Sequence, residues 1–154
     1  MSSVLKEQLR PMQMGDLPAV MQIEKQAYEF PWTIGIFSDC IRNHYHCRVY
    51  EVGGRVVAYT VMSVGVDECH LLNICVSEDF RQQGIGSHVI EQMLELAKRL
   101  NMRMAFLEVR CSNTAAARLY HRIGFNEIGR RKNYYPTARG REDALVLAFD
   151  FLNM

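Results

Sequence analysis

Two glycines stand two residues apart in the segment RQQGIGSHVI (81–90), where an apolar strand-like run gives way to a helix-like pattern. The segment is not a P-loop, because no Gly-Lys-Ser/Thr follows, and Val89 occupies the place of the third glycine of a dinucleotide fingerprint. The first turn of a helix still offers unpaired N–H groups and about half a positive charge. Gly84 and Gly86 lack Cβ, so a ligand can approach that backbone. The segment predicts a phosphate or pyrophosphate site, with a tight turn of no further function as the alternative.

One acidic residue, Glu108, lies inside the apolar strand pattern LEVR (107–110). It alternates with Leu107 and Val109, so its side chain is expected on the opposite face of the sheet from theirs. A carboxylate in this position is either paired in a salt bridge, for example with Arg110, or held in a cleft as a general base. The spacing alone leaves both interpretations open.

Other reactive side chains have ordinary structural interpretations. Tyr120 lies in a short helical pattern and fits a core tyrosine with a hydrogen-bonded hydroxyl group. His44 and His46 have the spacing of one strand face, but a structural zinc needs about four ligands and no second cluster is nearby, so no metal is expected. Cys69 and His70 are neighbours on a predicted strand and point apart, which argues against a thiol–imidazole pair.

Composition indicates a single globular domain spanning residues 1–154. Apolar residues make up 49% and charged residues 23%, the balance of an ordinary soluble protein, and the net charge of +1 indicates no direct nucleic-acid partner. The basic run 130–132 is typical of a solvated strand end. Five cysteines without a C-x-x-C pair indicate reduced thiols and a cytoplasmic protein. We expect no signal peptide and no membrane association, since no apolar run approaches about 20 residues.

The predicted strands follow from period-two patterns. Gly53-Gly54 between two such patterns is a strong hairpin signal. The segment CHLLNICVS (69–77) is apolar enough to be buried on both faces. Seven strands are expected, at 4–12, 46–52, 55–66, 69–77, 102–110, 125–135 and 142–151.

The predicted helices follow from apolar residues at three- and four-residue spacing. This spacing is clearest in the helix after the glycine loop, at Ile85, Val89, Met93, Ala97 and Leu100. Asp16 and Thr33 are expected to cap the first two helices, and Gly124 to end the last. Four helices are expected, at 17–28, 34–42, 84–100 and 113–123. This order of elements predicts an α/β (α+β) domain with helices packed on a mixed sheet.

The segments RQQGIG (81–86) and LEVRCSNTAAARLYHRIGF (107–125) together resemble the GNAT superfamily of acetyl-coenzyme A-dependent N-acetyltransferases. The first is short and degenerate, the second long and specific, and the resemblance extends from about Leu9 to Phe149. Four further segments narrow it: EFPW (29–32), LNICV (72–76), RKNYYPT (131–137) and EDALVL (142–147). They are similar to members that acetylate the N-terminal alanine of small-subunit ribosomal protein eighteen. The resemblance implies a twisted, mostly antiparallel mixed sheet of about seven strands, with about four helices packed on both faces.

The resemblance also implies acetyl-coenzyme A as cosubstrate, with no metal. Segment 74–76 would hold its pantetheine arm, with the Val76 N–H near the thioester oxygen, and segment 82–87 its pyrophosphate. Relatives often carry Arg or Lys at one or more of positions 82, 83 and 87, so attraction to the phosphates should be weaker here. Cys75 stands where alanine is common and is not expected to act as a nucleophile, because the family transfers acetyl directly. The implied cofactor-binding residues are Ile74, Cys75, Val76, Gln82, Gln83, Gly84, Ile85, Gly86, Ser87 and Asn113.

The implied reaction uses Glu108 as general base and Tyr120 as general acid. An α-amino group has a pKa of about 7.7–8.0, so roughly a tenth or more of it is neutral near pH 7. Such an amine does not need a strong general base. The expected partner is the N-terminal peptide of a ribosomal protein, bound by a monomer or weak dimer. For Trp32 and Tyr135, packing of their loops onto the core is the alternative role. The implied substrate-binding residues are Glu29, Trp32, Tyr134, Tyr135 and Asp143.

Two other functions remain compatible with the sequence. One is a GNAT enzyme that acts more broadly on protein N-termini or on a small-molecule amine. The other is a non-catalytic domain that binds acetyl-coenzyme A and a ribosomal protein. The aromatic loop segments favour a peptide substrate, and the presence of both Glu108 and Tyr120 favours catalysis.

Overall fold

The computed structural model describes residues 6–153, so the first two residues of the strand expected at 4–12 lie outside it. The chain divides into two compact units. The first contains residues up to Ser63 together with Asn73–Ile90, and the second contains Val64–Leu72 together with the residues from Glu91 onward. Within the described part of the chain, no helix has both the length and the hydrophobicity to cross a membrane.

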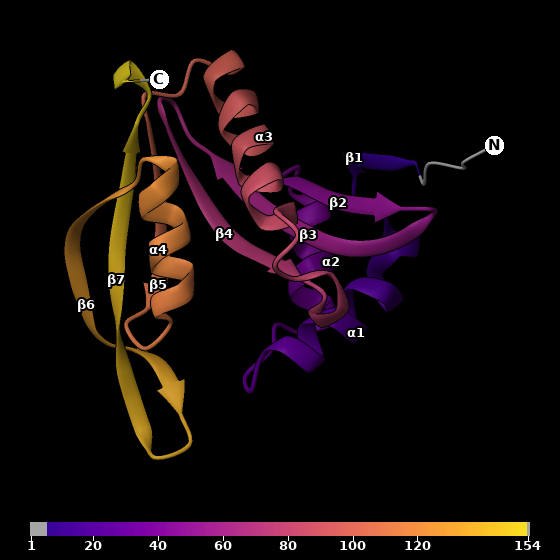
Figure 1. The fold of residues 1–154 in the computed structure, drawn as a ribbon, viewed down its shortest axis with the longest axis horizontal. Helices are drawn as coiled ribbons and strands as arrows, with labels where there is room; N and C mark the ends of the chain where they lie inside the picture. Colours follow the sequence, from indigo (N-terminus) through magenta and orange to yellow (C-terminus); the bar gives the residue numbers. More distant parts are fainter. Residues whose placement is uncertain (1–5, 154) are drawn as a thin grey trace. The chain divides into compact units, whose positions relative to one another are not determined.

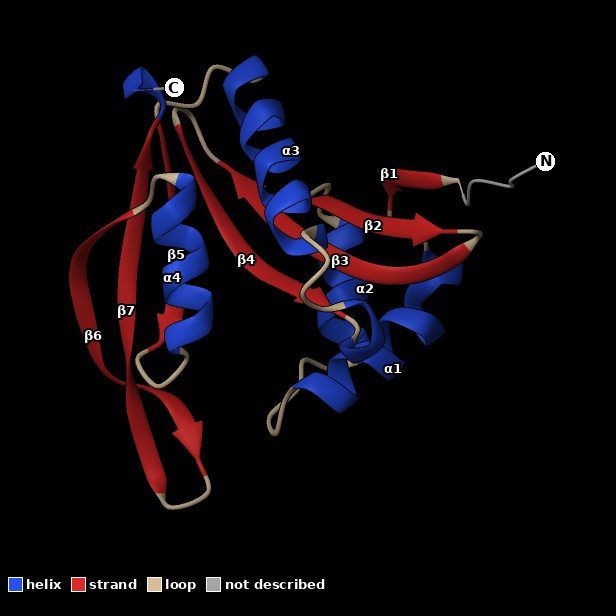
Figure 2. Cartoon of the chain, in the orientation of Figure 1, coloured by secondary structure: helices blue, strands red, loops and turns tan. Residues whose placement is uncertain are grey.

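The first unit is built on antiparallel strands and two amphipathic helices. Its elements are β1 (Glu7–Pro11), the 3-10 turn η1 (Met14–Asp16), α1 (Leu17–Ala27), α2 (Ile34–Arg42), β2 (His46–Val52), β3 (Arg55–Val64) and η2 (Glu78–Phe80). The predicted β2–β3 hairpin is confirmed (Figure 2). Both of its turn glycines, Gly53 and Gly54, have positive φ. The predicted cap of α2 is also confirmed, because the Thr33 Oγ1 accepts the Ile36 N–H at 3.2 Å.

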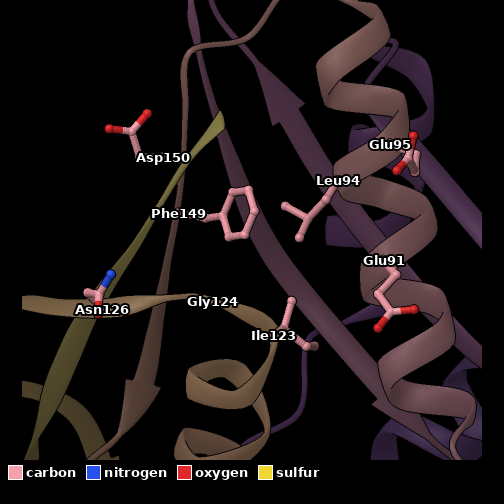
Figure 3. A pocket seen from close by; sticks show the side chains of 8 residues that line it. All are labelled: Glu91, Leu94, Glu95, Ile123, Gly124, Asn126, Phe149 and Asp150. Atoms are coloured by element: carbon pink, nitrogen blue, oxygen red, sulfur yellow. The ribbon is translucent and has the colours of Figure 1, made fainter. Parts of the chain in front are cut away.

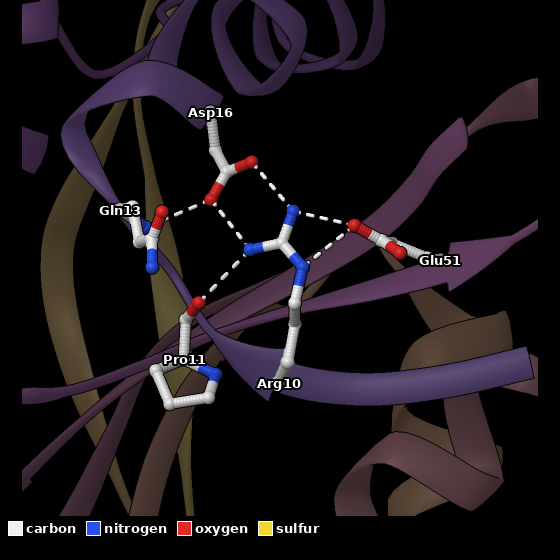
Figure 4. A network of polar contacts seen from close by, with 5 residues as sticks. All are labelled: Arg10, Pro11, Gln13, Asp16 and Glu51. Atoms are coloured by element: carbon white, nitrogen blue, oxygen red, sulfur yellow. Dashed lines mark hydrogen bonds and ion pairs between the residues drawn. The ribbon is translucent and has the colours of Figure 1, made fainter. Parts of the chain in front are cut away.

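The predicted cap of α1 is wrong, because the Asp16 carboxylate is bound elsewhere. It accepts two hydrogen bonds from the Arg10 guanidinium, at 2.7 and 2.8 Å, and one from the Gln13 N–H at 2.8 Å (Figure 4). Arg10 also donates to Glu51 at 2.6 Å, which links β1 to β2. The hydrogen bonds from Arg10 hold the pKa of Asp16 below its ordinary value. Asp16 still occupies the N-cap position of α1, but its side chain binds the charged Arg10 guanidinium at two points and makes no capping hydrogen bond to that helix.

The second unit carries the remaining strands and helices. Its elements are β4 (Glu68–Val76) and α3 (Ile85–Arg99), which it shares with the first unit, β5 (Met104–Arg110), α4 (Thr114–Ile123), β6 (Asn126–Thr137), β7 (Gly140–Asp150) and the 3-10 turn η3 (Phe151–Asn153). β6 and β7 form a long antiparallel hairpin (Figure 1), β7 pairs antiparallel with β5, and β4 pairs parallel with β5. The strand order β1-β2-β3-β4-β5-β7-β6 confirms the predicted seven-stranded mixed sheet with four helices.

Two predictions from periodicity are wrong in detail. β4 is buried on one face rather than both, because Cys69, Leu71 and Cys75 are buried while the residues between them are partly exposed. Leu100 follows the end of α3 and is 38% exposed, although the four earlier positions of its predicted apolar face are buried. The alternation in β5 is confirmed, with Leu107 and Val109 buried.

Replacement of Gly124 is opposed both by its backbone conformation and by a close neighbour. It ends α4 at φ 129°, and its N–H donates to the carbonyls of Tyr120 and His121. A Cβ here would lie 2.9 Å from Cε2 of the Phe149 ring. We predict that Gly124→Ala lowers the free energy of unfolding by about 1–3 kcal/mol, measured by urea denaturation.

The matched control is Gly129→Ala in β6. Gly129 has no positive φ, and a Cβ built on it meets nothing within 4 Å. Its free energy of unfolding should change by no more than about 0.5 kcal/mol. Equal effects of the two substitutions would contradict this account of the α4 terminus.

Candidate active site

The glycine loop of the first unit turns into α3 through two left-handed residues, Gln82 (φ 61°) and Gly84 (φ 81°). The His88 N–H donates to the Gly84 carbonyl at 3.0 Å, which closes the first helical turn. The N–H groups of residues 85–87 belong to that turn, where the α-helical pattern provides no acceptor. The loop is exposed. Its conformation suits the predicted binding of a phosphate group.

The end of β4 holds its carbonyl groups in hydrogen bonds within the first unit. The Tyr28 hydroxyl donates to the Ile74 carbonyl at 3.1 Å, and the Arg81 Nε donates to the Val76 carbonyl at 3.1 Å. The parallel ladder with β5 includes only Glu68–His70 of β4. The Val76 carbonyl also lies 3.9 Å from the Cys75 Sγ, so contacts within the first unit fix both carbonyl groups.

Cys75 lies between these two residues and is buried. Burial raises the pKa of its thiol. A thiol that resists ionisation is a poor nucleophile. The geometry therefore supports the expectation that Cys75 is not a nucleophile in this protein.

A buried carboxylate that the sequence analysis did not single out, Glu24 on α1, organises the first unit. Its side chain is almost fully buried, with the residue only 2% exposed. It accepts hydrogen bonds from the Tyr59 hydroxyl at 2.6 Å, the Trp32 backbone N–H at 2.9 Å and the Asn73 side-chain amide at 3.1 Å. Burial raises the pKa of Tyr59 far above its ordinary value, so its hydroxyl remains a donor. These hydrogen bonds connect α1 to the loop at Trp32, to β3 and to β4.

The sequence contains a signal for Glu24. It is the one charged residue among the buried positions of α1, which are Leu17, Val20, Ile23 and Glu24. A charge on the apolar side of a helix needs hydrogen-bond partners, and the pattern could have identified it.

In the second unit, Glu108 of β5 is paired on both of its carboxylate oxygens. One oxygen contacts the His70 Nε2, and the other lies 3.3 Å from the Arg131 Nε. The Glu108 side chain is 8% exposed. The suggested pairing with Arg110 is wrong, because Arg110 donates to Glu142 at 2.8 Å instead. Of the two alternatives from the sequence, the salt bridge is confirmed, with Arg131 in place of Arg110, and the role of Glu108 as general base stays a prediction.

Strand register explains why the sequence did not reveal these partners. His70 pairs with Phe106 across the parallel β4–β5 ladder, and Glu108 is two residues further along on the same face. Arg131 was expected only as part of a solvated basic run, but it reaches Glu108 from β6. Neither contact is visible in sequence spacing, because both depend on which strands are neighbours.

α4 and its N-cap residue provide two further predicted site residues of this unit, Tyr120 and Asn113. Tyr120 is buried, with its ring 5.8 Å from that of Phe125 in an edge-on contact. The Asn113 amide oxygen accepts the Ala116 N–H at 3.2 Å and caps the helix. Asn113 therefore has a structural role in addition to the predicted contact with a cofactor.

The predicted aromatic substrate residues lie in both units. In the second, the rings of Tyr134 and Tyr135 are 4.9 Å apart, and the Arg110 guanidinium lies 4.6 Å from the Tyr135 centroid. Tyr134 is 43% exposed, whereas burial raises the pKa of Tyr135 to about 12. In the first, the half-buried Trp32 packs 5.1 Å from Phe37, so packing onto the core accounts for part of its role.

The two predicted acidic substrate residues differ in their surroundings. Glu29 is exposed, in the loop between α1 and α2. The Asp143 carboxylate already accepts the Asn133 N–H at 3.0 Å and contacts Arg130 at 3.4 Å. The structure thus assigns Asp143 to stabilising the irregular part of the β6–β7 hairpin.

Two further features lie apart from the predicted site residues. His44 is in a turn with φ 61° and His46 begins β2, so the expectation that they share a strand face is wrong. No group of three or more His, Cys, Asp or Glu side chains among residues 6–153 is arranged to hold a metal ion.

A cavity of the second unit contains none of the predicted site residues (Figure 3). It is lined by Glu91, Leu94, Glu95, Ile123, Gly124, Asn126, Phe149 and Asp150.

Comparison with known proteins identifies the family. Residues 8–125 match the model of the acetyltransferase (GNAT) family. The chain is 39% identical over 133 residues to the [ribosomal protein bS18]-alanine N-acetyltransferase of Escherichia coli K12, covering 86% of this chain and 90% of that protein. It is 35% identical to a putative enzyme of the same name from Bacillus subtilis, covering 92% and 94%. The crystal structure of the ribosomal-protein-S18-alanine N-acetyltransferase from E. coli superposes with a TM-score of 0.89 at 36% identity, covering 94% of each chain. The chain therefore belongs to the acetyltransferase (GNAT) family and is an acyltransferase.

Proposed function

We propose that this protein transfers the acetyl group of acetyl-coenzyme A to the α-amino group of the N-terminal alanine of ribosomal protein bS18. The names of the relatives support this choice of acceptor. The structural observation that carries the proposal is the Glu108 carboxylate, buried in β5 and held by His70 and Arg131. A fixed carboxylate of this kind suits a general base.

Residues of the first unit are suited to bind the cosubstrate. Bound acetyl-coenzyme A would supply the acetyl thioester. The N–H groups of segment 82–87 would donate to its pyrophosphate, and the backbone of Ile74 and Val76 would bind the pantetheine arm. The Val76 N–H would stabilise the negative charge that develops on the acetyl oxygen. The glutamines at positions 82 and 83 make this a site that relies on backbone donors more than on cationic side chains.

Residues of the second unit are suited to move protons. Glu108 would take the proton from the attacking α-amine, directly or through water. Tyr120 would donate a proton to the departing thiolate. A thiol has an ordinary pKa of about 8.5, so this donation helps without being essential. A lysine amine with a pKa of about 10.4 would be neutral only about once in two thousand molecules near pH 7, which favours the α-amine as acceptor.

Aromatic and acidic side chains are suited to hold the rest of the peptide. Tyr134 is exposed and Trp32 half-buried, so both can contact cationic or aromatic side chains of the substrate, whereas the Tyr135 ring already lies against Arg110 and has less free surface. Glu29 is the better candidate for pairing with a basic residue, because the Asp143 carboxylate is engaged with Asn133 and Arg130.

The acceptor assignment is tested with a peptide that begins Ala-Arg-Tyr and contains one internal lysine. We predict efficient acetylation of the α-amine and none of the lysine, with the acetyl group located by tandem mass spectrometry. Blocking the N-terminus beforehand should abolish transfer. Acetylation of the lysine side chain, or preferential acetylation of a polyamine offered in parallel, would refute the assignment.

The cofactor loop is tested with Gly86→Val. A side chain on the second residue of α3 should obstruct the approach of a pyrophosphate to the backbone. The affinity for acetyl-coenzyme A should fall at least tenfold, or about 1.4 kcal/mol, by calorimetry. Gly35→Val is the control, because Gly35 is the second residue of α2 and its Cβ would meet only the Thr33 Oγ1, at 3.7 Å. Unchanged affinity in Gly86→Val would show that the loop only shapes a turn.

The proton chemistry is tested with Glu108→Gln and Tyr120→Phe. Glu108→Gln should lower turnover strongly at pH 7 and less as the pH rises, because more of the amine is then already neutral. Tyr120→Phe should lower turnover with little change in the affinity for acetyl-coenzyme A. The exposed Glu127 provides the control substitution Glu127→Gln. If both variants keep full activity across the pH range, Glu108 and Tyr120 have structural roles only.

A further inference from the structure

A buried general base has to lose the proton that it accepts in every catalytic cycle. The Glu108 side chain is only 8% exposed, so direct exchange with bulk water is restricted. The proton therefore needs an acceptor in contact with the carboxylate. The candidates for this acceptor are the side chains that reach Glu108 from the neighbouring strands.

Of the two side chains that contact the carboxylate oxygens, one cannot accept a proton. The Arg131 guanidinium has five N–H donors and no acceptor. An imidazole ring, by contrast, has one nitrogen that can accept a proton and one that can release a proton. The His70 ring contacts the second carboxylate oxygen through Nε2, and its side chain is 33% exposed. His70 thus connects a buried carboxylate to solvent.

A third titratable group close to Glu108 is Tyr135, whose pKa is raised in part by the charge of Glu108. Burial is the larger cause, and together they raise the pKa of Tyr135 to about 12. Its hydroxyl is therefore protonated near neutral pH and has little capacity to accept the proton as a base. The nearby Arg110 and Glu142 are paired with each other. Among the described residues near Glu108, His70 is the group suited to this task.

We propose that His70 carries the proton from Glu108 to solvent. Glu108 gains the proton that the amine loses as the new C–N bond forms. The protonated carboxyl group then transfers it to Nε2 of the neutral His70 ring, in the tautomer that carries its hydrogen on Nδ1, which gives a carboxylate and an imidazolium. The imidazolium releases one proton to water, and exchange of the remaining hydrogen with water returns the neutral ring to the Nδ1 tautomer. This inference rests on the proposed function, because it takes Glu108 to be the base.

The test uses His70→Gln and His70→Ala in the full chain, assayed with the alanine peptide at low buffer concentration. Glutamine keeps a hydrogen-bonding side chain beside Glu108, but it does not take up a proton as imidazole does. We expect kcat to fall about tenfold or more in both variants, with the affinity for acetyl-coenzyme A and the melting temperature unchanged. Added imidazole should restore kcat in proportion to its concentration, because it can take the proton from Glu108 in place of the missing ring.

The exposed His121 of α4 gives the control His121→Gln, which should have the wild-type kcat with and without imidazole. A His70→Gln variant with the wild-type kcat would overturn the proposal, as would a loss in both His70 variants that imidazole does not reduce. Glu108→Gln separates the two claims. Loss of activity that imidazole cannot restore supports Glu108 as the base, whereas full activity would overturn that assignment. Wild-type turnover in the His70 variants alone would overturn only the proton-carrier role.

Discussion

A carboxylate that is taken out of water must be given hydrogen-bond donors by the chain around it, and both units hold such a group among the described residues. Glu24 receives donors from a loop and two strands in the first unit. Glu108 in the second is contacted by Arg131, which can only donate, and by the His70 ring, and these two residues come from two strands. The strand register and the loop conformations have to bring hydrogen-bond partners to these two carboxylates. The carboxylates therefore constrain the positions of the proposed site residues around them.

The two carboxylates have different chemical prospects because their partners differ. Glu24 is surrounded by a phenol, an amide and a backbone N–H, which donate hydrogen bonds but do not exchange protons readily near neutral pH. One carboxylate oxygen of Glu108 contacts the His70 imidazole, and the His70 side chain is partly exposed to solvent. The first arrangement holds a structure in place, and the second is the one to which we assign proton transfer.

Local patterns in the sequence predicted the elements well, because they depend on interactions between near neighbours. The Gly53-Gly54 hairpin, the Thr33 cap and the alternation in β5 all belong to this class. The Asp16 cap failed because Arg10 competes for the same carboxylate. The partners of Glu108 could not be predicted from spacing, since His70 lies 38 residues away and reaches it only through the β4–β5 register. Glu24 was detectable as a charge on an apolar helix face.

The central claim is that this chain acetylates the N-terminal alanine of bS18 through Glu108. The most direct measurement is mass spectrometry of the bS18 N-terminus in cells that lack the chain and in cells that regain either the wild type or Glu108→Gln. The account predicts an unmodified alanine without the chain, an acetylated alanine with the wild type, and little acetylation with Glu108→Gln at equal protein levels. An alanine that stays acetylated without the chain, or equal restoration by both forms, would contradict it.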